Sequence, residues 1–302
     1  MHILLMTAYF PPEIGSASHI FYDLGQTFIA HGHEVSVVTG FPSYHAQGDL
    51  DKYKGKWTYR EDMDGINVYR TVVPQIARDT PIGRGLWQFS CAASFAIAGF
   101  RPPRADVALV YSPPLPLGLA ALTWRWLRNT PFVFNVQDLF PQSAVDLGIL
   151  HQKPLIRFFE QLEKYTYRHA DGITVHSSGN RDHVITNGGK PETTIVMHNS
   201  VDIDSVRPQP KQNELRAELG LEDKFILSFG GVIGHSQDLD VVLEAAQRLR
   251  DREQIHFLLV CDGVEKERLV NKCQAMGMEN VTWMPMQQRE RYPRVLHASD
   301  VG

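Results

Sequence analysis

The sequence predicts an α/β protein made of two Rossmann-like, doubly wound domains in series, the second of them incomplete. Three observations lead to this fold class. Apolar stretches of strand length alternate with helical patterns along the chain, which is typical of a parallel sheet with helices on both faces. A glycine-containing loop follows the first strand of each half, at residues 9–16 and 229–236. The length of 302 residues suits about two domains of ordinary size.

The first half is expected to open with a β-α-β unit. Ser16 or Ser18 is expected to cap its helix, and Gly32 to end it. The dipeptide Asp64-Gly65 predicts a hairpin, because this pair favours a tight two-residue turn. The expected strands are 2–8, 34–39, 57–60, 66–72, 107–111, 132–137, 173–176 and 194–198. The expected helices after the first one are 85–100, 117–128 and 155–169.

The domain boundary is predicted from a proline-containing stretch without helix or strand pattern, residues 203–212. This linker separates a first domain of residues 1–202 from a second of residues 213–302. The strands expected in the second domain are 225–229, 256–261 and 281–283, and the helices are 239–249, 265–276 and 290–298. The last four residues have the pattern of a strand that is just beginning. We therefore expect a truncated second domain with an uncovered sheet edge, and a chain that is by itself weak or inactive as an enzyme.

Composition excludes several classes of protein. A formal net charge of −4 argues against a nucleic-acid binder, which would carry a basic face. Cys91, Cys261 and Cys273 form no C-x-x-C pair, so neither a disulfide framework nor a zinc site is expected, and a reducing, cytoplasmic location fits. The start of the chain lacks the basic and long apolar segments of a secretory signal. The uncharged stretch 85–100 is shorter than the roughly 20 residues that cross a bilayer.

Both glycine-containing loops are candidate ligand sites, because doubly wound sheets bind ligands beyond the carboxyl ends of their strands. In the first loop, Gly15 and Ser16 precede a helix whose N-terminus favours negative charge. In the second, Gly230, Gly231 and His235 make a candidate cradle for a diphosphate. The alternative for the first loop is a plain strand-to-helix connection, and the alternative for the second loop is a tight turn. Neither loop is G-x-G-x-x-G, which disfavours a nicotinamide enzyme.

One carboxylate and one uncharged helix complete the candidates. Asp138 follows a buried strand, so it either lines the site or caps the next helix. Trp87 and Phe89 of the stretch 85–100, with Arg84 and Arg101 at its ends, fit a helix at a membrane interface, and burial against the sheet is the alternative. The histidines and the D-x-D pairs lack the context of metal ligands, so no metal or cofactor is expected.

Six stretches in order resemble the family 4 retaining glycosyltransferases of GT-B fold, and in particular the bacterial O-antigen and colanic-acid enzymes of L-fucosamine transferase type. They are YFPPEIGSASHIFYDLGQTFIAHGHEVSVVTGFPSYH, YSPPLPLGLAALTWRWLRNTPFVFNVQDLFPQSAVDLGIL, HNSVDIDSVRP, SFGGVIGHSQDLDVVLEAA, LLVCDGVEKERL and VTWMPMQQRERYPRVLHASDVG. The resemblance implies sugar transfer with retention from a nucleotide sugar, UDP-linked, to a lipid-linked glycan acceptor, without a metal. It implies that the first domain binds the acceptor, in peripheral contact with the inner membrane, and that the second binds the nucleotide.

The resemblance also implies roles for single residues. Asp138 faces the donor sugar, and Gly15 lies beneath the donor diphosphate. Asp262 and Gly263 follow a strand at the cleft, and Met284 lies where backbone groups meet the base. The leaving diphosphate takes the acceptor's proton, so no side-chain nucleophile is required.

The chain also departs from the family pattern. His235 and Gln237 stand where many members carry an arginine and a lysine, and Gln142 replaces a frequent glutamate. The Glu-x7-Glu segment that holds the donor sugar does not occur before Gly302. Two other functions remain open: a nucleotide-sugar 2-epimerase of the same fold, and an inactive remnant that only binds acceptor or partner.

Overall fold

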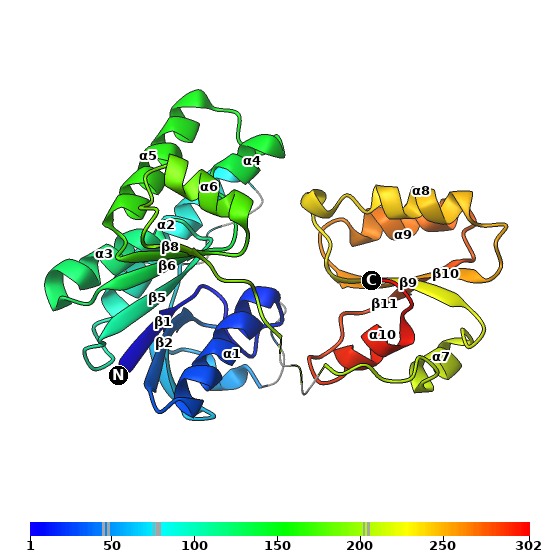
Figure 1. The fold of residues 1–302 in the computed structure, drawn as a ribbon, viewed down its shortest axis with the longest axis horizontal. Coiled ribbons are helices and arrows are strands. Elements are labelled where there is room, and N and C mark those ends of the chain that lie inside the picture. The colour runs from blue at the N-terminus through cyan, green and yellow to red at the C-terminus, as the bar shows by residue number, and fades with distance from the viewer. Residues whose placement is uncertain (44–45, 47–48, 75, 77–79, 202, 204–205) are drawn as a thin grey trace. The chain divides into compact units, whose positions relative to one another are not determined.

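The computed structural model describes the chain except residues 44–45, 47–48, 75, 77–79, 202 and 204–205. It divides into two compact units, Met1–Ser200 and Val201–Gly302 (Figure 1). The predicted linker, residues 203–212, begins just after this division, and part of it lies outside the described residues. Each unit is a sheet with helices on both faces, which confirms the predicted fold class.

The first unit contains one sheet of eight strands in the order β3-β4-β2-β1-β5-β6-β7-β8, all parallel except β3. The strands are β1 (His2–Met6), β2 (Glu34–Gly40), β3 (Thr58–Met63), β4 (Ile66–Thr71), β5 (Val107–Ser112), β6 (Phe132–Val136), β7 (Gly172–Val175) and β8 (Thr194–Val196). The helices are α1 (Ser16–Ala30), the short η1 (Asp51–Tyr53), α2 (Pro81–Ala98), α3 (Leu117–Arg128), α4 (Gln142–Asp146), α5 (Lys153–His169) and α6 (Ser178–Thr186).

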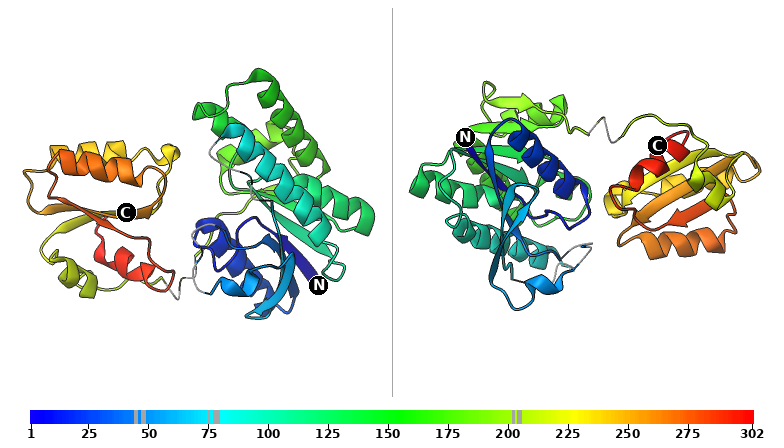
Figure 2. Two further views of the ribbon diagram at one scale, coloured as in Figure 1. Left: turned by 180° about the vertical axis from the view of Figure 1, so that it is seen from behind. Right: turned by 90° about the horizontal axis from the view of Figure 1, so that it is seen from below.

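Alternating side chains of the central strand divide this unit into layers. Leu4 and Met6 of β1 join a buried cluster with α2, α3 and α5, whereas Ile3 and Leu5 point to the opposite face and pack with α1. Figures 1 and 2 show α1 on one face of the sheet and the other three helices on the other face. Successive residues of a strand point to opposite faces, so near-continuous apolar strands are what a sheet covered on both faces requires.

The hairpin predicted at Asp64-Gly65 is confirmed. Both residues have positive φ angles, 52° and 84°, as a two-residue turn of this kind needs. β3 pairs with β4 antiparallel, and β4 pairs with β2 parallel. The hairpin therefore widens the main sheet at one edge.

The second unit holds the parallel sheet β11-β10-β9. Its elements are α7 (Glu214–Leu219), β9 (Phe225–Val232), η2 (His235–Gln237), α8 (Asp240–Arg248), β10 (Ile255–Asp262), α9 (Lys266–Ala275), β11 (Val281–Met284) and α10 (Tyr292–Ala298). Apolar residues of α7 and α10 pack on one face, and those of α8 and α9 pack on the other (Figure 1). Val301 lies beside Leu227 of β9 in a parallel bridge.

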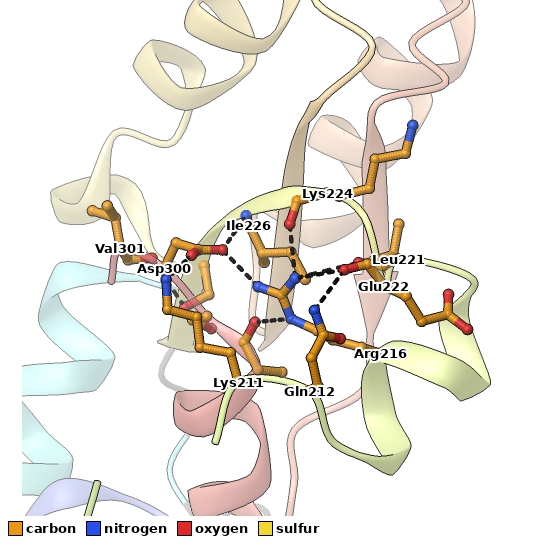
Figure 3. A network of polar contacts seen from close by, with 12 residues as sticks. Lys211, Gln212, Arg216, Leu221, Glu222, Lys224, Ile226, Asp300 and Val301 are labelled. Carbon is orange, nitrogen blue, oxygen red and sulfur yellow. Dashed lines mark hydrogen bonds and ion pairs between the residues drawn. The ribbon is translucent and has the colours of Figure 1, made fainter. Parts of the chain in front are cut away.

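A buried ion pair joins the start of α7 to the residues beside β9 (Figure 3). Arg216 donates to Asp300 Oδ2 at 2.6 Å, and to the carbonyl oxygens of Ala298 and Lys224 at 2.9 and 2.8 Å. The same carboxylate oxygen accepts the Ile226 amide at 2.9 Å. Because the Arg216 and Asp300 side chains are only 3% and 7% exposed, this contact works at low dielectric, where leaving either charge unpaired is costly.

Several predictions differ from the structure. Neither Ser16 nor Ser18 caps α1: Gly15 is the N-cap residue without a side-chain bond, and the Ser18 hydroxyl is buried with no partner among the described residues. Helices α4, α6 and α7 were not expected, because each is short or poor in apolar residues. Strand β9 continues to Val232, so Gly230 and Gly231 lie in the strand and not in the loop after it.

Candidate functional site

Four parallel strands of the first unit end at one edge of the sheet. The pairs Met6–Val110, Ser112–Val136 and Val136–Val175 place the ends of β1, β5, β6 and β7 side by side. The loops after these strands carry polar side chains and Gly15. In doubly wound sheets this edge is where ligands bind, so it is the first of two candidate sites, one in each unit.

Asp138 lies at this edge, two residues beyond the end of β6, and its side chain is exposed. Desolvation by its surroundings raises the pKa of Asp138, and the nearby His176 opposes that rise. Among the residues that the structure describes, none donates a hydrogen bond to the Asp138 carboxylate. A carboxylate that is partly desolvated and has no internal donor suits a bond from a ligand hydroxyl group.

Sequence reasoning missed two side chains beside Asp138. Burial raises the pKa of the Tyr111 hydroxyl, and the charges of Asp138 and Tyr9 raise it further. His176 Nδ1 is buried, with no hydrogen-bond partner in the described structure. Both residues lie at strand ends, Tyr111 in β5 and His176 directly after β7. A prediction of the strand order would have placed both residues beside Asp138.

An amide network fixes the backbone on which Asp138 stands. Gln137 Nε2 donates to Asn135 Oδ1 at 2.9 Å and to Asn199 Oδ1 at 3.1 Å. Asn199 Nδ2 returns a bond to Gln137 Oε1 at 2.8 Å, and Asn135 Nδ2 donates to the Thr174 hydroxyl at 2.8 Å. Because these amides bond one another across β6 and β7, the end of β6 is held in one position.

The loop before α1 is held by two buried charged side chains. Arg70, which is fully buried, donates to the carbonyl oxygen of Pro11 and pairs with Glu61 at 2.6 Å. The buried Glu13 carboxylate accepts the amides of Phe10 and Ser43 at 3.3 and 2.9 Å. These contacts fix the loop between β1 and α1.

Gly15 itself stands in open space. Its φ of 161° is extended backbone, and an added Cβ would meet no atom within 4 Å. Ser16 is exposed as the first residue of α1. Nothing in the fold therefore requires glycine at position 15, and the space above it is open to a ligand.

Helix α2, which contains most of the uncharged stretch 85–100, is buried on one side. Trp87 stacks on Tyr9 with ring centroids 6.3 Å apart, and Phe89 packs against Phe159 at 6.3 Å. Arg101 donates to the carbonyl oxygen of Arg70. Of the four candidate membrane residues, Arg84 and Arg101 are exposed, whereas Trp87 and Phe89 are half-buried. None of the helices in the described ranges combines the length and apolar character that a bilayer crossing requires.

The second candidate site is the carboxyl edge of the smaller sheet. The pairs Gly230–Val260 and Val260–Met284 form one row across all three strands. Asp262 ends β10, and Gly263 follows it. The structure therefore brings the predicted residues Gly230, Asp262, Gly263 and Met284 to a single edge. His235 begins η2 nearby, and its side chain lies outside the described part.

The three glycines at this edge have different physical roles. A Cβ at Gly230 would lie 2.1 Å from the Tyr292 hydroxyl oxygen, and one at Gly263 would lie 2.2 Å from the Ile233 carbonyl oxygen. Those two positions need glycine for internal packing. At Gly231, by contrast, the nearest atom to an added Cβ is 3.9 Å away. Gly231 has a φ of 152°, which by itself favours glycine, and the space beside it is open to a ligand.

A polar hollow of about 210 Å³ lies beside this edge, and Asp238, Asp240, Glu265 and Arg268 contribute to its lining. Arg268 and Lys272 both bond Asp240, and these hydrogen bonds lower its pKa to about 2. Carboxylates outnumber the single guanidinium, so the field in the hollow opposes a phosphate group. In the part of the chain that is described, no three His, Cys, Asp or Glu side chains gather as metal ligands do.

Two family models match the chain. The "Glycosyl transferase 4-like domain" matches residues 15–200, and "Glycosyl transferases group 1" matches residues 211–301. The chain is 25% identical over 308 residues to "Putative colanic acid biosynthesis glycosyl transferase WcaI" of Escherichia coli K12, covering 99% of this chain and 75% of that protein.

Solved structures share the fold. A structure of Anabaena Alr3699/HepE in complex with UDP and glucose superposes with a TM-score of 0.68 at 17% identity, covering 99% of this chain and 72% of the other. WaaG, a glycosyltransferase involved in lipopolysaccharide biosynthesis, gives a TM-score of 0.68 at 15% identity, covering 99% and 73%.

Proposed function

Because the chain belongs to the glycosyltransferases described by the 4-like and group 1 family models, we propose that it moves a sugar from a UDP-sugar to a lipid-linked glycan acceptor. The transfer retains the anomeric configuration and serves the synthesis of O-antigen or exopolysaccharide. The relation to WcaI supports this pathway class, and the UDP and glucose named for HepE support the donor. The first unit binds the acceptor and the second binds the nucleotide.

The proposal rests mainly on two sheet edges, one in each unit, that have open space for a ligand. Gly15, which precedes α1 in the loop after β1, and Gly231, near the carboxyl end of β9, each have open space beside them. The first edge also presents Asp138, whose carboxylate has acceptor capacity for a sugar hydroxyl group. Loop dipoles stabilise charge on the leaving diphosphate, which takes the proton of the acceptor hydroxyl group.

The direct test measures transfer of the sugar from the donor to the lipid-linked acceptor. The protein is supplied with a panel of UDP-sugars and a lipid-linked glycan extract, and the anomeric configuration of the product is read by NMR. Donor-dependent transfer with retention supports the proposal. Release of epimerised UDP-sugar without acceptor would favour the 2-epimerase, and binding of acceptor without turnover would favour the remnant.

Gly15→Ala separates a ligand role from a folding role. Because an added Cβ meets no atom within 4 Å and the backbone is extended, the free energy of unfolding should change by less than about 0.5 kcal/mol. The methyl group would instead occupy the space of the donor, so kcat/KM should fall at least about tenfold. The paired measurement is urea denaturation and transfer rate on one preparation. Unchanged transfer would remove Gly15 from the donor site.

We further propose that the first unit meets the inner membrane through the outer sides of α2 and α3. Ile97, Trp126 and Leu127 are 75%, 60% and 72% exposed, with basic side chains nearby, and such a surface suits an anionic bilayer. The double variant Ile97→Ser and Trp126→Ser should lose flotation with phosphatidylglycerol vesicles. Trp57→Ser, at an 82% exposed tryptophan outside these helices, is the control and should float as the unchanged protein does.

A further inference from the structure

The glycine loop of the second unit has no cation of its own for a diphosphate. Residues 230–238 contain neither lysine nor arginine. A diphosphate carries charge that loop dipoles alone do not balance, and charge-assisted hydrogen bonds to phosphate oxygens are the strong ones. A cation from another element is therefore needed if this edge binds the donor.

Helix α9 carries three cations, and two of them are already paired. Arg268 bonds Asp240 at 2.6 Å and Glu265 at 2.7 Å, and Lys272 bonds Asp240 as well. Arg268 lines the acidic hollow, and Lys272 bonds Asp240 of its lining. Within the described ranges, no carboxylate pairs with the third cation, Lys266.

Lys266 points to the end of the central strand. Its Nζ donates to the carbonyl oxygen of Cys261 at 2.9 Å, which leaves two of its three N–H groups for other acceptors. Cys261 is the register partner of Gly231, the glycine with open space. The Cys261 side chain belongs to the cluster beneath α8 and α9, so the ammonium group and the open side of Gly231 lie on the same face of the sheet.

We propose that Lys266 binds the diphosphate of the nucleotide donor, with the backbone at Gly231, and supplies the cation that the glycine loop lacks. This inference rests on the proposed function and adds a binding residue to it. Arg289 and Arg291 are the other cations near this edge, but they follow β11, which the central strand separates from the glycine strand. Lys266, in contrast, bonds the central strand, which is the direct neighbour of the glycine strand β9.

The test compares UDP with uridine, because the two ligands differ only in the diphosphate. Ligand-observed NMR on the whole chain should show that UDP binds more tightly than uridine. Lys266→Gln should weaken UDP binding roughly 10- to 100-fold and leave uridine binding within about twofold. Lys266→Arg should recover most of the loss. Lys272→Gln makes the same change on the same helix at a cation that is already paired, and should leave both affinities unchanged.

The outcomes distinguish the proposed UDP-sugar donor from the proposed role of Lys266. If the unchanged protein binds no UDP, the UDP-sugar donor and the role of Lys266 both fall. If UDP binding is normal and Lys266→Gln keeps the full preference for UDP over uridine, only the role of Lys266 is overturned. Equal loss of UDP and uridine binding in Lys266→Gln would mark a structural role and overturn it too.

Discussion

Asp300→Asn should destabilise the second unit by about 3 kcal/mol, since it leaves the Arg216 guanidinium buried without a counter-ion. The Asp300 carboxylate accepts bonds from Arg216, Lys211 and the Ile226 amide (Figure 3). An asparagine would turn an N–H group toward one of these donors. Hydrogen exchange of β9 peptides in the whole chain should report the loss, while β5 peptides stay protected as the internal reference.

The matched control for this change is Lys211→Gln. The Lys211 side chain is 61% exposed, and removing an exposed partner costs at most about 1 kcal/mol. A value for Asp300→Asn that is no larger than the control's would show that the buried pair does not hold the unit together.

The same contacts fix how this stability depends on pH. Burial by itself raises the pKa of Asp300, but hydrogen bonds from Lys211, the Ile226 amide and Arg216 outweigh it and lower the pKa to about 2. An unfolded aspartate titrates near about 3.9. The stability that the ionised Asp300 contributes is therefore fully present above about pH 4 and is lost as the pH falls toward about 2. In Asp300→Asn, this part of the acid unfolding should disappear.

Asp138→Asn should lower kcat/KM for sugar transfer about 100-fold, with UDP affinity unchanged because the proposed nucleotide site lies in the second unit. The amide keeps the shape of the side chain and removes only its charge. Asp146→Asn, at an exposed aspartate of α4, is the control and should retain activity within about twofold. Transfer by Asp138→Asn within about threefold of the unchanged rate would exclude the carboxylate from the reaction.

The pH profile gives a second readout for Asp138. Desolvation raises its pKa, and the ionised form exists above that pKa. Activity should therefore fall with decreasing pH at a value above the ordinary range of an aspartate, about 3.9. The asparagine variant should lack this acid limb.

Strong periodicity made most of the fold predictable. The helix expected at 117–128 coincides with α3, because its apolar residues are dense and regular. Helix α6 was missed because its sequence is mostly polar. It is held by the Ser177 cap, which accepts the Asn180 amide at 3.2 Å, and by contacts with β7 and β8.

The candidate site was less predictable, because convergence of side chains depends on which strands are neighbours. Asp138 was found from its place at a strand end. Tyr111 and His176 come from other strands, and only the strand order brings them beside it. The packing role of Gly230 needs Tyr292, a residue from the other end of the second unit, and no local pattern indicates that contact.

Alkylation of the three buried cysteines can report which of the two units has opened. Cys91 lies in the first unit, Cys261 and Cys273 lie in the second, and all three are buried. Burial also raises the pKa of the Cys261 thiol to about 11, so folded Cys261 presents little thiolate to an alkylating reagent at neutral pH. Opening of the first unit alone adds one label to the intact mass, and opening of the second alone adds two. Mass spectrometry after a brief pulse of iodoacetamide would therefore resolve the two units in a single sample.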